Sequence, residues 1–129
     1  MLRVQPLLVS TSINVAAKTN GTANGTGLDL AGVDAPSVCF LVGTWTDGSH
    51  VLTVEESDLL ASAYTTVAAG DLVGTLTSIT AGGGSNVQQF ISYKGAKRFV
   101  RGVIVTSGAT TGAVVGALIV QGHRQAADG

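Results

Sequence analysis

The sequence has few charged residues, few aromatic residues and a single cysteine. Charged residues make up 12% of the 129 residues and aromatic residues 5%, whereas hydrophobic residues make up 45%. A typical soluble domain carries about 25% charged residues, which keep its surface in water. With so little charge, either a membrane or partner molecules must cover part of the surface. The lone Cys39 excludes an intrachain disulfide and a metal site built from thiols, and its apolar neighbours predict a small buried side chain.

Long hydrophobic runs are also missing. A membrane-spanning helix needs about 20 consecutive apolar residues, and the longest run here is the eight residues 113–120. The apolar stretch that follows Arg3 is broken at Gln5, Pro6 and Ser10, so no cleaved signal peptide is expected. We therefore expect partner molecules, and not a membrane, to cover the apolar surface.

Motifs that carry chemistry are absent. His50 and His123 have no second ligand at metal-binding spacing, and Glu55 and Glu56 are neighbours on a predicted strand, where adjacent side chains point to opposite faces. The glycines at 82–84 are not followed by the Gly-Lys-Ser/Thr of a phosphate-binding loop. We expect no enzymatic activity, no metal and no cofactor.

Basic residues gather in one place only. The net charge is −1, whereas nucleic-acid-binding domains present strongly basic surfaces. We interpret the cluster as a basic strand end that aids solubility or pairs with acidic groups of a partner, and we expect no nucleic-acid binding. Its members are Lys94, Lys97, Arg98 and Arg101.

The sequence is rich in glycine and in β-branched residues, and this composition predicts an all-β chain. Strand-like segments follow one another at roughly 8–12-residue spacing, with turn residues between them, which is typical of a sandwich or barrel. We expect about eight strands in a single jelly-roll-like β-sandwich over 1–129, with loose tails at 1–6 and 122–129. The candidate strands are 7–15, 37–45, 50–56, 72–79, 87–93, 98–105 and 113–120, together with the two short candidates 28–30 and 64–67.

Two hairpins are predicted from turn residues. Asp47-Gly48 suits a tight turn between 37–45 and 50–56. The small residues after Val105 predict a second hairpin, with arms 98–105 and 113–120.

The last predicted strand is apolar on both faces. One face carries Ala113, Val115, Ala117 and Ile119, and the other carries Val114, Gly116, Leu118 and Val120. A domain of this size buries only one such face in its own core, so the other needs a partner, most simply a second copy. Charge placed on this strand should therefore disrupt either folding or assembly. The candidate interface comprises Val114, Leu118, Val120, Ile119, Phe99 and Arg101.

Several runs of the chain resemble small structural proteins encoded in the head-gene region of tailed bacteriophages. They include Gly43–His50, Glu55–Ser57, Val67–Gly74, Tyr93–Arg101 and Gly108–Ala113, with Lys18–Thr22 and Gly27–Leu30 in the same pattern. The resemblance implies a capsid decoration (cement) protein that is made in the host bacterial cytoplasm. It also implies a homotrimer, bound to the major capsid protein on the virion surface.

Two other classes of function stay open at this point. One is a different virion component of the tail, neck or fibre. The other is a carbohydrate-binding sandwich in which Trp45 and Tyr64 stack on a sugar.

Overall fold

The computed structural model describes residues 9–33 and 35–121, and the predicted tails and His123 lie outside them. The described residues form ten strands and two short 3₁₀ turns, which confirms the all-β prediction. The strands are β1 (Val9–Lys18), β2 (Gly21–Asn24), β3 (Leu28–Asp29), β4 (Ser37–Trp45), β5 (Ser49–Ser57), β6 (Thr65–Thr66), β7 (Leu72–Val73), β8 (Gln89–Tyr93), β9 (Phe99–Ser107) and β10 (Ala113–Val120). The 3₁₀ turns are η1 (Ala69–Asp71) and η2 (Gly82–Gly84).

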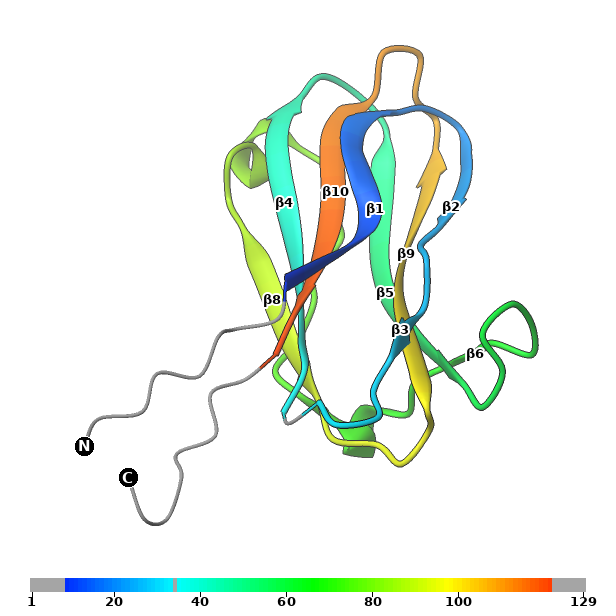
Figure 1. Cartoon of the computed structure of the whole chain (residues 1–129). Coiled ribbons are helices and arrows are strands. Elements are labelled where there is room, and N and C mark those ends of the chain that lie inside the picture. Colours follow the sequence, from blue (N-terminus) through cyan, green and yellow to red (C-terminus); the bar gives the residue numbers. More distant parts are fainter. Residues whose placement is uncertain (1–8, 34, 122–129) are drawn as a thin grey trace.

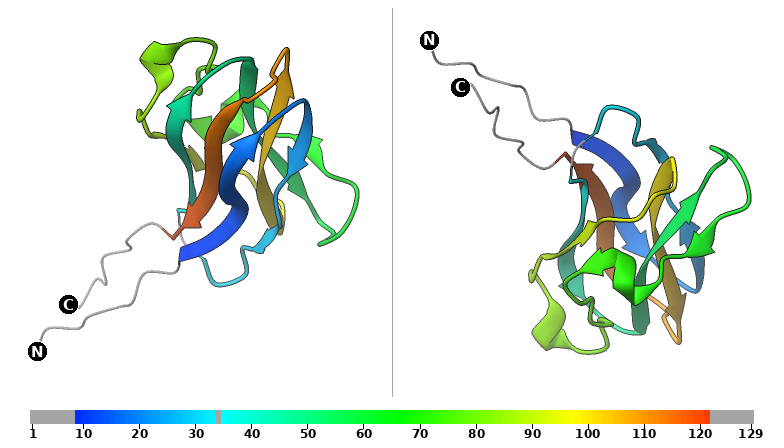
Figure 2. Two further views of the ribbon diagram at one scale, coloured as in Figure 1. Left: turned by 90° about the horizontal axis from the view of Figure 1, so that it is seen from above. Right: turned by 90° about the horizontal axis from the view of Figure 1, so that it is seen from below.

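The strands form two antiparallel sheets packed face to face (Figures 1 and 2). Sheet A has the order β1-β10-β4-β8-β7, and sheet B has the order β2-β9-β5-β6, with β3 also paired to β9. The pairing is nested: β1 pairs with β10, β2 with β9, β4 with β8 and β5 with β6. This is the strand order of a jelly roll, in which a long antiparallel ribbon is rolled into a sandwich.

The core lies between the sheets and comes from alternate positions of the central strands. Strand β4 contributes Val38, Phe40 and Val42, and β10 contributes the face that begins at Ala113 and ends at Ile119. Sheet B covers them with side chains of β5 and β9, among them Leu52, Val54, Val100 and Ile104. The period of two in the sequence therefore identifies which face of each long strand is buried.

Both predicted hairpins are wrong. Strands β4 and β5 lie in different sheets, and so do β9 and β10. The turn residues are nevertheless turns, since Gly48, Gly108 and Gly112 all have positive φ. They form arches that carry the chain from one sheet to the other, so that each strand pairs with a segment far away in sequence.

Asp47 ties these two arches together. Its carboxylate accepts hydrogen bonds from the backbone N–H groups of Thr110 (3.1 Å), Thr111 (3.1 Å) and Gly112 (2.6 Å). The Gly112 carbonyl in turn accepts the N–H of Thr46 at 2.9 Å. The arch between β4 and β5 is thus fixed to the arch between β9 and β10.

The Asp47 contacts make stability dependent on pH. The hydrogen bond from Gly112, followed by those from Thr111 and Thr110, holds the pKa of the Asp47 carboxyl below its ordinary value of 3.8. Because the folded-state pKa is lower than the unfolded one, the stabilisation is complete above pH 3.8 and is lost as the pH falls through the folded value. We expect Asp47→Asn to flatten the loss of unfolding free energy between pH 6 and pH 3, measured by urea titration. Parallel profiles for the two proteins would contradict this assignment.

The segment predicted as a strand over 72–79 is mostly irregular. Strand β7 ends at Val73, because Gly74 adopts a φ of 112° and turns the chain. The chain then crosses to sheet B, where Ile79 forms a single bridge to His50. The sandwich therefore has an open side, bounded by the short edge strands β6 and β7.

Candidate interaction surface

The predicted interface residues do not form one surface. Val114, Leu118 and Val120 point outward from sheet A and are partly exposed. Ile119 is fully buried in the core and Phe99 is 8% exposed, so neither is available to a partner of the folded chain. Arg101 belongs to sheet B, where it is bonded to Glu55. The interface prediction is therefore corrected to its three outward members on β10.

These three residues belong to a larger apolar face that spans all five strands of sheet A. One row of directly paired residues runs across the sheet as Thr11, Leu118, Cys39 and Phe90. A second row contains Val9, Val120, Ser37, Ser92 and Val73. With strands about 4.8 Å apart, five of them give a face about 19 Å wide. We call the residues of these two rows, with Val114, Gly116 and Leu41, the outer face of sheet A.

No residue of this outer face carries a charge. Its polar side chains are few, and the hydroxyls of Ser37 and Ser92 are bonded to each other at 2.9 Å. The outer face of sheet B differs, because Arg101 and Glu55 form an ion pair there, with 2.6 Å between Nη2 and Oε1. The two outer faces of the sandwich thus differ in charge.

Phe90 is the most exposed large hydrophobic side chain of this face, at 70%, with Val73 at 58%. In the predicted strand 87–93, Phe90 lies on the same face as Gln88 and Ser92. These polar neighbours predict that this face points to solvent. Only the pairing of β8 beside β4 brings Phe90 next to Cys39 and into the same row as Leu118. For this reason Phe90 is absent from the interface predicted from the sequence.

Cys39 lies in the middle of the same face. It is partly exposed, so the prediction of a buried side chain is wrong. Partial burial raises the pKa of its thiol, which keeps it protonated and slow to react at neutral pH. As the chain's one cysteine, it offers a chemical label at the centre of the outer face.

Several titratable side chains form hydrogen bonds within the sandwich. His50 is fully buried, with Nδ1 at 2.8 Å from Thr106 Oγ1 and Nε2 at 3.0 Å from the Asp47 carbonyl oxygen. Glu55 and Glu56 point to opposite sides as predicted, because Glu55 bonds Arg101 whereas Glu56 accepts the Tyr93 hydroxyl at 2.7 Å. Burial, together with the bond to Glu56, raises the pKa of Tyr93 to about 12.

The basic cluster is largely neutralised within the chain. Lys97 pairs with Asp58 and Arg98 with Asp29, each at 2.9 Å, beside the Arg101–Glu55 pair. Within residues 9–33 and 35–121 there is no group of three histidine, cysteine or acidic residues placed to hold a metal ion. In the same part of the chain, no helix has the length and apolar character needed to cross a membrane.

The two residues considered for sugar stacking lie apart. Trp45 ends β4 in sheet A, and its Nε1–H donates to the Gly48 carbonyl at 2.9 Å. Tyr64 precedes β6 in sheet B, and its hydroxyl donates to the Leu60 carbonyl at 2.8 Å. They do not form a common platform for a sugar ring.

Comparisons of the chain with protein-family models, with curated proteins and with solved structures found no match. The outer face of sheet A is consequently interpreted from its own chemistry.

Proposed function

We propose that the protein is a capsid decoration protein of a tailed bacteriophage, made in the host cytoplasm and bound to the outside of the assembled head. The observation that carries the proposal is the uncharged apolar face that covers sheet A from edge to edge. The resemblance of the sequence to head-region structural proteins indicates the class of partner. In this proposal the outer face of sheet A rests on the major capsid protein.

The energetics of this face favour a permanent partner. Monomeric proteins keep exposed apolar patches to a few hundred Å², because each exposed Å² costs about 25 cal/mol relative to burial. In this proposal, contact with the shell covers Phe90 and its neighbours and removes that cost. The outer face of sheet B, which carries the Arg101–Glu55 ion pair, then faces solvent.

The direct test compares heads of the encoding phage made with and without this gene. We expect heads that lack the protein to dissociate at lower temperature and to be cleaved faster by protease, and purified protein to restore both properties. Equal stability of the two kinds of head, or absence of the chain from purified virions, would overturn the proposal. Electron microscopy of a labelled copy distinguishes the head from the tail, neck or fibre, which is the other virion location.

A pair of variants tests whether the outer face of sheet A is the docking face. Leu118→Asp places a charge in the middle of the face, whereas Val51→Asp places one on β5 of sheet B, at a valine that is 38% exposed. We expect Leu118→Asp to weaken binding to bare heads at least 100-fold and Val51→Asp to change it less than 3-fold. We also expect bound protein to be protected from alkylation at Cys39. Equal effects of the two variants, or unchanged alkylation on the head, would place the docking face elsewhere.

A further inference from the structure

The loop between β5 and β6 projects from the sandwich in all three ribbon views (Figures 1 and 2). At its tip Leu59 and Leu60 are each 56% exposed. The two leucines are adjacent in the chain, so together they form a small exposed apolar patch on this loop. We call residues 59–60 the leucine tip.

Hydrogen bonds from Ser57 and Tyr64 fix the backbone of the loop that carries the leucine tip. The Ser57 hydroxyl, itself buried, donates to the Ser62 carbonyl at 2.6 Å and accepts the Leu59 N–H at 2.9 Å. The Tyr64 hydroxyl donates to the Leu60 carbonyl, so the loop is bonded at both of its ends.

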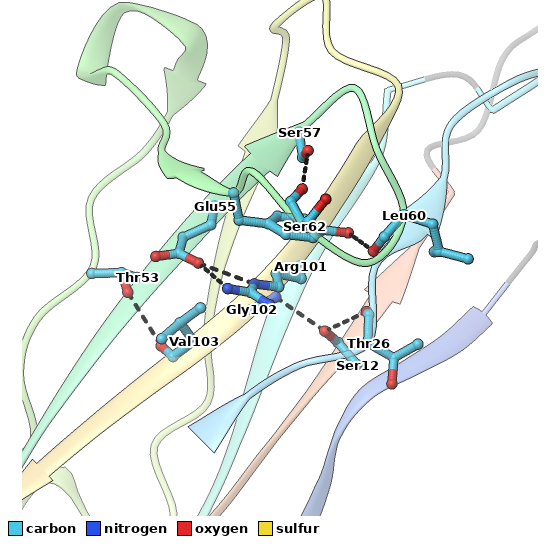
Figure 3. A network of polar contacts seen from close by, with 11 residues as sticks. Ser12, Thr26, Thr53, Glu55, Ser57, Leu60, Ser62, Arg101, Gly102 and Val103 are labelled. Carbon is cyan, nitrogen blue, oxygen red and sulfur yellow. Dashed lines mark hydrogen bonds and ion pairs between the residues drawn. The ribbon is translucent and has the colours of Figure 1, made fainter. Parts of the chain in front are cut away.

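Sheet B fixes Tyr64 in turn. The Arg101 guanidinium carbon lies 4.0 Å from the centre of the Tyr64 ring, a cation–π contact. Glu55 in turn forms an ion pair with the Arg101 guanidinium (Figure 3). Gly27 packs so closely on Tyr64 that a Cβ at this position would collide with the tyrosine hydroxyl. In Figure 3 the Leu60 side chain points away from this network. The network therefore presents the leucines outward and does not bury them.

A complementary cleft lies at the open side of the same sandwich. It has a volume of about 190 Å³, larger than the engineered cavity of about 150 Å³ that accommodates a benzene molecule. No charged side chain lines it. Its apolar walls are Leu52, Val54, Val67, Leu72, Leu76 and Ile91, with Thr66 and Thr75 at polar positions.

We propose that the leucine tip of one copy of the chain occupies this cleft in a second copy. The chain carries both parts of the contact, and its own leucines remain exposed, so they do not fill its own cleft. Because every copy carries both a tip and a cleft, a closed oligomer, either a two-fold dimer whose copies exchange tips or a ring, satisfies every tip and every cleft at once. The contact does not depend on binding to a capsid.

The test is the mass of the protein in solution, measured by light scattering after size exclusion. The double variant Leu59→Ser/Leu60→Ser removes the tip, Thr75→Trp fills the cleft from an exposed position, and Val105→Ser is the control at another exposed valine. We expect the wild-type chain and the control to form a closed oligomer, and each of the other variants to be a 12.9 kDa monomer with unchanged circular dichroism. A monomeric wild-type chain at 100 μM, or variants that stay oligomeric, would overturn the proposal.

Mixing the two monomeric variants gives a sharper result. The tip-deleted copy still has a cleft and the cleft-filled copy still has a tip, so one contact forms between them. We expect a two-chain species of twice 12.9 kDa in the mixture and in neither variant alone. A mixture that stays monomeric would contradict a contact between the leucine tip and the cleft. Leu118→Asp should keep the wild-type oligomer, which separates this contact from the docking face on sheet A.

Discussion

Replacing Ile119 by aspartate is expected to leave no folded protein. Ile119 is fully buried on β10, between Ser10 of β1 and Val38 of β4. The substitution removes the buried side chain and puts a carboxylate into the core. Each effect costs several kcal/mol, and their sum is comparable to the whole stability of a small domain, about 5–15 kcal/mol. Far-UV circular dichroism at 20 °C should show an unfolded chain.

Leu118→Asp is the matched control for this experiment. The same charge is introduced one position earlier on the same strand, but the side chain points outward beside Thr11 and Cys39. We expect this variant to fold with an unfolding free energy within about 1.5 kcal/mol of the wild-type value. A folded Ile119→Asp with a wild-type denaturation midpoint would mean that β10 presents the opposite face to the core.

The side-chain pattern predicted which face of a strand is buried better than it predicted which strands lie next to each other. The apolar pattern on both sides of 113–120 predicts an apolar environment for each face, and the structure puts one of these faces in the core. Which strand lies beside it depends on contacts between distant segments. Asp47-Gly48 is a turn in a hairpin and in an arch alike, and the acceptor role of Asp47 involves residues more than 60 positions away.

The candidate site was predictable only in part for the same reason. The apolar pattern of one strand was enough to predict Val114, Leu118 and Val120 as surface residues of the site. Phe90 and Val73 join them only through strand pairings across the sheet. Phe99 belongs to the predicted interface, yet it is buried on sheet B, paired with Asp29 and Ser57. A single sequence carries no direct signal for such neighbours.

The second substitution with a large expected effect on stability is at Gly112, in the arch between β9 and β10. This residue has a φ of 85°, and a Cβ attached to it would overlap the carbonyl oxygen of Lys18 at the end of β1. Its N–H donates to Asp47, so the chain has little freedom to move away. We expect Gly112→Ala to destabilise the protein by about 3–5 kcal/mol, because the strain of positive φ adds to a clash with backbone. Urea unfolding monitored by Trp45 fluorescence measures the change.

Gly108 provides the control within the same arch. It also has a positive φ, 65°, but nothing lies within 4 Å of the position that a Cβ would take. Gly108→Ala should therefore show the conformational strain alone, about 1–2 kcal/mol. The difference between the two variants isolates the contact between the arch and the end of β1, where the first and last strands of the jelly roll are joined. Equal losses would mean that the arch shifts to relieve the clash, and that the register of β1 on β10 is set by the strand pairing itself.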